Sequence, residues 1–111
     1  MVRTVTIYAG EFYEFYNRQN PKVRQKINWT IGLLENLQII PECYFKHIES
    51  TNLYEIRIIF GGNKYRIFSF FDSGSEIIIL NGFQKKTRLT PKNEIEKALK
   101  LKEQYYEDKN Q

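Results

Sequence analysis

The sequence has one cysteine, Cys43, and one histidine, His47, among its 111 residues. A single cysteine excludes an internal disulfide, and a zinc site of Cys and His ligands cannot be assembled from one residue of each kind. No apolar run approaches the roughly 20 residues that a membrane-spanning helix needs, and no signal-peptide-like segment follows Met1. We therefore expect a reduced, cytoplasmic protein with no metal site and no membrane association.

Proline and glycine are also scarce, with three and six residues. Hydrophobic residues make up 41% of the chain and charged residues 27%, which is typical of a globular protein and excludes a disordered or fibrous one. A chain of this length forms one hydrophobic core. We therefore predict a single domain that spans residues 1–111.

Positive charge is unevenly distributed in this chain, whose formal net charge is +4. Residues 53–92 contain seven Lys and Arg against three Asp and Glu, whereas the counts are six against five in residues 1–52 and four against five in residues 93–111. Aromatic residues are frequent, at 15%. Basic and aromatic side chains together favour an anionic partner, nucleic acid first, although many basic domains bind no such partner.

The first half of the chain predicts a short strand followed by two helices. Residues 4–8 are β-branched and aromatic, and Ala9 and Gly10 end that strand. Aromatic residues at helical spacing predict a helix over residues 11–18. Asn20 and Pro21 are a helix start, and the apolar stripe of the second helix, which runs to about residue 37, is Val23, Ile27, Ile31 and Leu34. Residues 41–52 show no periodicity and are expected to be a connection.

The second half predicts three strands and a final helix. Strand-like runs cover residues 53–60, 64–71 and 76–83, and the turns between them are short and rich in glycine. A helix is expected after Pro91, with an apolar stripe of Ile95, Ala98, Leu99 and Tyr106, and residues 107–111 are expected to fray. The predicted fold is α+β, with two N-terminal helices packed on a small antiparallel sheet, which consists of the N-terminal strand and a three-stranded meander, and with a C-terminal helix.

Two arginines are predicted to lie side by side on this sheet. Side chains alternate along a strand, so Glu55 and Arg57 lie on the face opposite the apolar side chains, which the helices leave free. A two-residue turn after residue 60, at either possible position, leaves Arg66 on the same face as Arg57, whereas a three-residue turn separates them. Like charges side by side destabilise a sheet, so the pair is either neutralised by Glu55 or used to hold a phosphate.

The groove that this arrangement predicts is polar, basic and aromatic. If the turn at Ser73 is also a two-residue turn, Asn81 and Phe83 join the arginine face, and basic residues continue beyond its edge. Guanidinium groups bind phosphate, and aromatic rings stack on unpaired bases. The candidate RNA contacts are Lys64, Tyr65, Asn81, Phe83 and Arg88. The alternative is a solvated sheet face with an ion pair between Glu55 and Arg57.

Five short motifs occur in an order that resembles the RelE/HigB-type toxins of type II toxin–antitoxin systems, in particular their phage-related branch. The motifs are LYEIR at residues 53–57, YRI at 65–67, LNGFQKKT at 80–87, TP at 90–91 and EIEKA at 94–98. The strand and two helices that precede them also match the organisation of this family. The resemblance therefore includes nearly the whole chain.

The resemblance implies a RelE-like fold and ribosome-dependent cleavage of mRNA, without metal or cofactor, by attack of the RNA 2′-hydroxyl on the adjacent phosphate. Such a reaction needs cations for the phosphorane, a base and an acid. By position, the catalytic candidates are Arg57 and Arg66 for the phosphate, Lys85 and Lys86 as the basic pair, and Glu55 as a base or as an orienting group for Arg57. The resemblance also implies two partners, mRNA on the ribosome and a cognate helix-turn-helix antitoxin.

The chain departs from the family at its C-terminus, where several members carry a catalytic tyrosine or histidine. Here Tyr105 and Tyr106 lie far along the expected final helix, and we interpret them as packing residues. The general acid and base stay unassigned. Two other functions remain open, because fold does not determine function: a non-enzymatic, ParE-like poison of DNA gyrase, or an inert phage-derived binding module.

Overall fold

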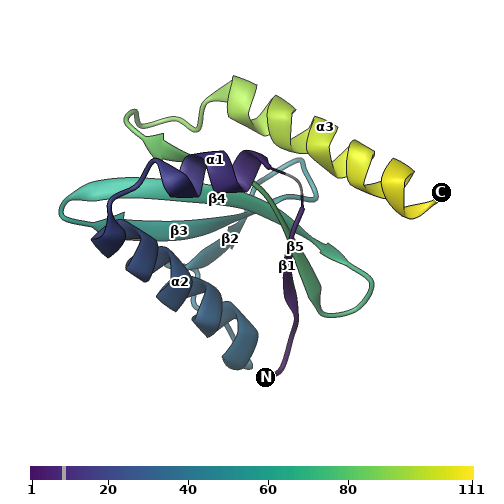
Figure 1. Cartoon of the computed structure of the whole chain (residues 1–111), viewed down its shortest axis with the longest axis horizontal. Helices are drawn as coiled ribbons and strands as arrows, with labels where there is room; N and C mark the ends of the chain where they lie inside the picture. The colour runs from purple at the N-terminus through teal and green to yellow at the C-terminus, as the bar shows by residue number, and fades with distance from the viewer. Residues whose placement is uncertain (9) are drawn as a thin grey trace.

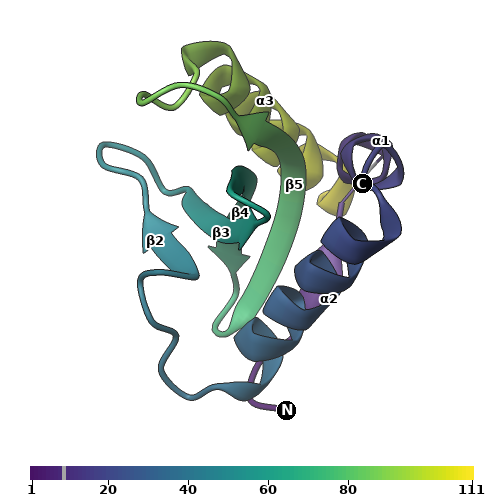
Figure 2. The ribbon, with the colours of Figure 1, turned by 90° about the vertical axis from the view of Figure 1, so that its left-hand side faces the viewer.

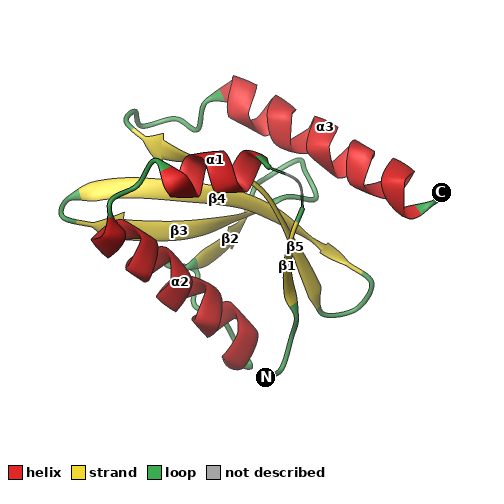
Figure 3. Ribbon diagram, in the orientation of Figure 1, coloured by secondary structure: helices red, strands yellow, loops and turns green. Residues whose placement is uncertain are grey.

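The computed structural model describes residues 1–8 and 10–111, and it shows three helices and a five-stranded mixed sheet (Figures 1 and 3). The elements are β1 (Val5–Ile7), α1 (Glu11–Asn17), α2 (Pro21–Asn36), β2 (Phe45–His47), β3 (Tyr54–Phe60), β4 (Asn63–Asp72), β5 (Glu76–Lys85) and α3 (Lys92–Lys109). The strand order is β1-β5-β4-β3-β2. The predicted α+β class is confirmed. The predicted end of the first strand at Ala9 lies outside the described residues.

The sheet differs from the expected one at both edges. β1 pairs parallel with β5, so the sheet is mixed and the expectation of a purely antiparallel sheet is wrong. β2 lies within residues 41–52, for which a connection was expected, and it pairs antiparallel with β3. Three residues are too few to show the alternation of a strand, so only pairing with a neighbouring strand reveals β2.

The start and the buried stripe of α2 are as predicted. The Asn20 side chain accepts a hydrogen bond from the Val23 N–H at 3.0 Å, and Pro21 occupies the first helical position, where its missing N–H costs no hydrogen bond. Val23, Ile27 and Leu34 are buried in the core that α1 and α2 form with one face of the sheet. Figure 2 shows these two helices together along one flank of the sheet.

The second face of the sheet is covered in part by α3. Ala98 and Leu101 pack on side chains of β4 and β5 such as Phe68 and Leu80. Leu99, which was expected in the buried stripe of α3, is 41% exposed, so that expectation is wrong. The face that carries Glu55 was expected to be free of helices, and this is also wrong where α3 covers β4 and β5.

The C-terminal end of α3 is bound to the end of β4. The buried Asp72 carboxylate accepts hydrogen bonds from Tyr105 Oη at 2.6 Å and from Lys109 Nζ at 2.5 Å, and Tyr8 donates to Asp108. The helix therefore continues to Lys109, and the expectation that residues 107–109 fray is wrong. Within the described residues, no helix is both long enough and apolar enough to cross a membrane.

Candidate functional site

The hairpin between β3 and β4 brings Arg57 and Arg66 together. Gly61 and Gly62 form a two-residue loop with φ of 58° and 80°, a conformation that glycine adopts without strain. In the resulting register Arg57 is directly opposite Arg66. This confirms that the two arginines are neighbours on one face of the sheet.

Two irregularities of the sheet determine which residues of β5 lie beside the arginines. Neither was predicted from the sequence. Asp72 pairs with Glu76, so the turn between β4 and β5 has three residues, and the condition of a two-residue turn is not met. The register then shifts by one residue at a β-bulge in β5, because Ser69 of β4 pairs with Ile79 whereas Ile67 pairs with Gly82. The two shifts combine to place side chains of the end of β5 on the arginine face.

The result is a basic strip across three strands, which we define as Arg57, Lys64, Arg66 and Lys85. Phe83 is directly opposite Arg66, and Lys85 is directly opposite Lys64. Directly opposite residues lie on the same face of a sheet, so the four cations share one face with the Phe83 ring. Phe83 thus lies on the arginine face as predicted, although by a different route, whereas Lys85, which was expected beyond the edge of that face, lies on it as well.

A single carboxylate lies among these cations. Glu55 Oε1 is 3.4 Å from Arg57 Nε and 3.5 Å from Arg66 Nε. Both Nε atoms are buried, and neither makes a hydrogen bond within the part of the chain that the structure describes. Arg66 is only 2% exposed, and its Nη1 donates to the Tyr65 carbonyl at 3.1 Å. Glu55 thus neutralises one positive charge of the strip and leaves an excess of cations.

Burial and, to a smaller extent, the neighbouring positive charges lower the pKa of two members of the strip. Burial lowers the pKa of Arg66, and the neighbouring Glu55 carboxylate opposes that change. Burial also lowers the pKa of Lys85, and the charges of Arg66 and Arg57 lower it further. A lowered pKa means that the charged form of the side chain is destabilised by its surroundings. An anion that binds beside such a side chain therefore stabilises its charged form more than it would that of an ordinary exposed cation.

Three predicted RNA contacts are less accessible than expected. Tyr65 lies on the opposite face of the sheet, buried against Phe15 of α1, so its expected place in the groove is wrong. Asn81 is 2% exposed, and its Nδ2 donates to the Glu94 carbonyl and carboxylate at 3.3 Å. Phe83 is 8% exposed. The inner part of the site is therefore closed rather than an open groove.

The outer part of the site is open. A hollow of about 530 Å³ lies where the end of β5 meets the β3–β4 hairpin. The predicted residues Lys64, Lys85, Lys86 and Arg88 line it together with Gly62, Asn63, Gln84 and Thr87. Lys64, Lys86 and Arg88 are exposed, so this hollow presents ammonium and guanidinium groups to solvent.

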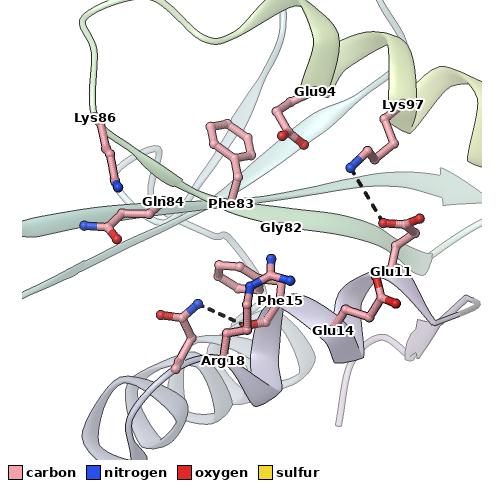
Figure 4. A pocket seen from close by; sticks show the side chains of 11 residues that line it. Glu11, Glu14, Phe15, Arg18, Gly82, Phe83, Gln84, Lys86, Glu94 and Lys97 are labelled. Atoms are coloured by element: carbon pink, nitrogen blue, oxygen red, sulfur yellow. Dashed lines mark hydrogen bonds and ion pairs between the residues drawn. The ribbon is translucent and has the colours of Figure 1, made fainter.

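A second hollow, of about 460 Å³, lies between α1, α3 and β5 (Figure 4). It adjoins the first hollow, because Gln84 and Lys86 line both. Sequence reasoning missed it, since its residues come from three elements far apart in the chain and have no common spacing. The only local signal is Gly82, where a Cβ atom would lie 2.5 Å from the Phe15 ring.

The chemistry available to this site is that of cations. Guanidinium and ammonium groups bind phosphate and stabilise developing negative charge on its oxygens. Within residues 1–8 and 10–111, no group of three or more His, Cys, Asp or Glu side chains is placed to hold a metal ion. The arrangement is suited to an anionic ligand with unpaired charge, such as a nucleic acid backbone.

Comparison with known proteins identifies the family. Residues 14–103 match the family described as phage derived protein Gp49-like (DUF891), which is associated with RelE-like toxins of toxin–antitoxin systems. No curated protein matches the chain. The match includes α2, β2–β5 and most of α3, and hence every residue of the basic strip. The chain therefore belongs to the Gp49-like family of phage-derived proteins.

Proposed function

We propose that the protein is the toxin of a type II toxin–antitoxin system and that it is an endoribonuclease of the RelE/HigB type, which cleaves mRNA on the ribosome. The observation that carries this proposal is the basic strip, in which four cations lie on one face of the sheet and only the two arginines are paired with a carboxylate, that of Glu55. Membership of a family associated with such toxins supports it.

The proposed reaction is attack of a ribose 2′-oxygen on the adjacent phosphorus, which breaks the bond to the 5′-oxygen of the next nucleotide. The products are a 2′,3′-cyclic phosphate and a 5′-hydroxyl, so the proton lost by the 2′-hydroxyl is balanced by one gained by the leaving oxygen. Arg57, whose side chain is 29% exposed, stabilises the negative charge of the phosphorane directly, and the buried Arg66 adds its positive charge from the inner part of the site. Lys86 binds a neighbouring phosphate. Protein cations do this work in the proposal, in place of a metal ion.

Lys85 is the proton donor that the geometry favours. It is on the same face as Arg66, and its pKa is lowered, chiefly by burial. An ammonium group with a lowered pKa transfers its proton to a leaving oxygen more readily than an ordinary lysine does. Glu55 contacts both arginines and is better placed to orient them than to take a proton.

The same strip predicts the partner of the free toxin. Uncompensated positive charge on an open hollow attracts an acidic segment, which would screen the charge and block RNA. We therefore propose that a cognate antitoxin, encoded with a helix-turn-helix DNA-binding domain, covers the basic strip. The RNA substrate and the antitoxin then compete for the same surface.

Primer extension on cellular mRNA after brief induction tests the proposal. The variants are Arg57→Ala and Arg66→Lys, the latter because Arg66 is buried, and the matched control is Lys100→Ala on the exposed face of α3. We expect cuts inside translated codons for the wild type and the control. The cuts should fall at least about a hundredfold in both arginine variants, with circular dichroism spectra unchanged.

Other outcomes point to other functions. Intact transcripts with arrested growth and DNA damage signalling would contradict RNA cleavage and favour a poison of DNA gyrase. Intact transcripts with normal growth would favour an inert phage-derived binding module. Growth arrest that survives both arginine variants would remove the basic strip from the mechanism.

A further inference from the structure

The second hollow is adjacent to the position that the proposed function gives to the RNA phosphate. Phe83 lines this hollow, and it is directly opposite Arg66 in the sheet. Lys86 and Gln84 line both this hollow and the basic one. A nucleotide whose phosphate lies on the basic strip therefore has the second hollow within reach of its base.

The lining of the second hollow is mostly polar, and it combines three carboxylates with the cations Arg18, Lys86 and Lys97. Figure 4 shows Glu11 and Glu14 on α1, Glu94 on α3 and the Phe83 ring on the side of β5 that faces away from α1. Glu11 is paired with Lys97 at 3.7 Å. Glu14 and Glu94 form no ion pair with any residue that the structure describes. Two carboxylates thus have hydrogen-bonding capacity that no cation uses.

A buried amide beside Glu94 is also incompletely satisfied. Asn81 Nδ2 donates to Glu94 Oε1 at 3.3 Å, whereas Asn81 Oδ1 is buried without a hydrogen-bond partner in the described part of the chain. A buried acceptor without a donor is costly and calls for an explanation. Asn81 does not line the hollow, but its amide group holds Glu94 there. Glu94 Oε2 makes no hydrogen bond to a residue that the structure describes, so a ligand in the hollow can donate to it.

We propose that the second hollow takes the base next to the scissile phosphate and that Glu94 recognises guanine there, an inference that rests on the proposed function. Guanine presents a ring N–H beside an amino group, and these two donors match the two oxygens of one carboxylate. Adenine and cytosine present an acceptor beside their amino group, and uracil flanks its N–H with two carbonyl oxygens. All three place an acceptor against the carboxylate, which Glu94 disfavours.

The test uses purified ribosomes and mRNAs that differ only at the base beside the cut, which is guanine, inosine, adenine, cytosine or uracil. Inosine retains the ring N–H of guanine and lacks only the amino group. The variants are Glu94→Gln and, as control, Glu96→Gln, which is exposed on α3 outside the hollow. We expect the wild type and Glu96→Gln to cleave the guanine substrate about tenfold faster than the inosine one, and Glu94→Gln to lose most of this ratio.

The ratio of two rates from one enzyme is independent of how much of each variant is folded. Equal rates on all bases, or a guanine preference that Glu94→Gln keeps, would overturn the base-recognition inference and leave the nuclease proposal standing. Absence of cleavage by the wild type would overturn both. Weaker antitoxin binding by Glu94→Gln, with the base preference unchanged, would make the hollow a protein-binding site and overturn the inference.

Discussion

At the scale of single residues, the carboxylate of Glu55 determines whether the arginine pair is tolerated. Arg57 and Arg66 repel one another across two strands, and the Glu55 carboxylate lies within 3.5 Å of both. Arg66 is almost fully buried, so its charge depends on this neighbour more than a surface arginine would.

Glu55→Gln should therefore destabilise the protein. Removal of one partner leaves the buried Arg66 charge uncompensated, and we expect the free energy of unfolding in urea to fall by about 3 kcal/mol. The control is Glu49→Gln, an exposed residue without an ion pair among the described residues, which should change it by less than about 0.5 kcal/mol. Equal effects of the two substitutions would show that Glu55 is not needed to hold the arginines.

Two glycines should respond in opposite ways to the same substitution. Gly82→Ala places a methyl group 2.5 Å from the Phe15 ring, which is buried and cannot move aside, so we expect a loss of about 1–3 kcal/mol in the free energy of unfolding. Gly32→Ala meets no atom within 4 Å inside α2, and helix propensity alone predicts a gain of up to about 1 kcal/mol. Urea titrations of both variants measure the contrast, and a neutral Gly82→Ala would disprove the close approach of α1.

At the scale of elements, sequence patterns predicted what depends on local chemistry. Backbone positions with a positive φ favour glycine, so Gly61 and Gly62 indicated the turn that places the two arginines opposite each other. The parallel pairing of β1 and the bulge of β5 depend on which distant strand lies alongside, and no local pattern encodes that. Tyr65 was misplaced for a related reason, because its aromatic ring was considered without the alternation that directs it toward α1.

The end of α3 provides a test of long-range anchoring. The hydrogen bond from Lys109, and then the one from Tyr105, lowers the pKa of Asp72 below its ordinary 3.8, although burial opposes this. The stabilisation is thus fully present above that ordinary value and declines as the pH falls below it. We expect Asp72→Asn to lower the melting temperature by about 5 °C at pH 7 and by much less at pH 2.5.

A matched variant separates charge from packing at this anchor. The variant is Asp108→Asn. Asp108 is also near the end of α3, but it accepts its hydrogen bond from Tyr8, whose pKa is raised to about 12 chiefly by that hydrogen bond. The substitution leaves the contacts of Asp72 unchanged, so the pH dependence of melting should remain close to that of the wild type. A constant difference between Asp72→Asn and the wild type at all pH values would contradict the role of the carboxylate charge.

At the scale of the whole molecule, the excess of four positive charges is concentrated on one surface. The net charge of +4 equals the excess in residues 53–92, and the sheet gathers cations of that segment into the basic strip. The uneven distribution of charge could be recognised in the sequence, because it requires only a count of the charged residues in each segment. The closure of the inner site by α3 could not, because it depends on how the last helix packs.

Lys85→Gln should make the protein more stable and less active. Burial and the charges of Arg66 and Arg57 lower the pKa of Lys85, so its charged form costs the folded state stability. The gain in melting temperature should be full at pH 7 and should disappear as the pH rises toward 10.5, where the wild-type ammonium loses its proton in any case. Thermal melting from pH 7 to 10 measures this, with Lys100→Gln as control, and a lower melting temperature at pH 7 would contradict it.

The excess of cations over carboxylates in the basic strip also affects how long the free protein resists degradation. A ligand that binds only the folded state stabilises it by mass action, and a polyanion that neutralises the strip is such a ligand. Without that ligand the chain unfolds more often, and the unfolded chain is cleaved by proteases. In the proposed toxin–antitoxin system, the chain that is freed when its antitoxin is degraded would be both at its most reactive and at its shortest-lived, so each episode of activity would limit its own duration.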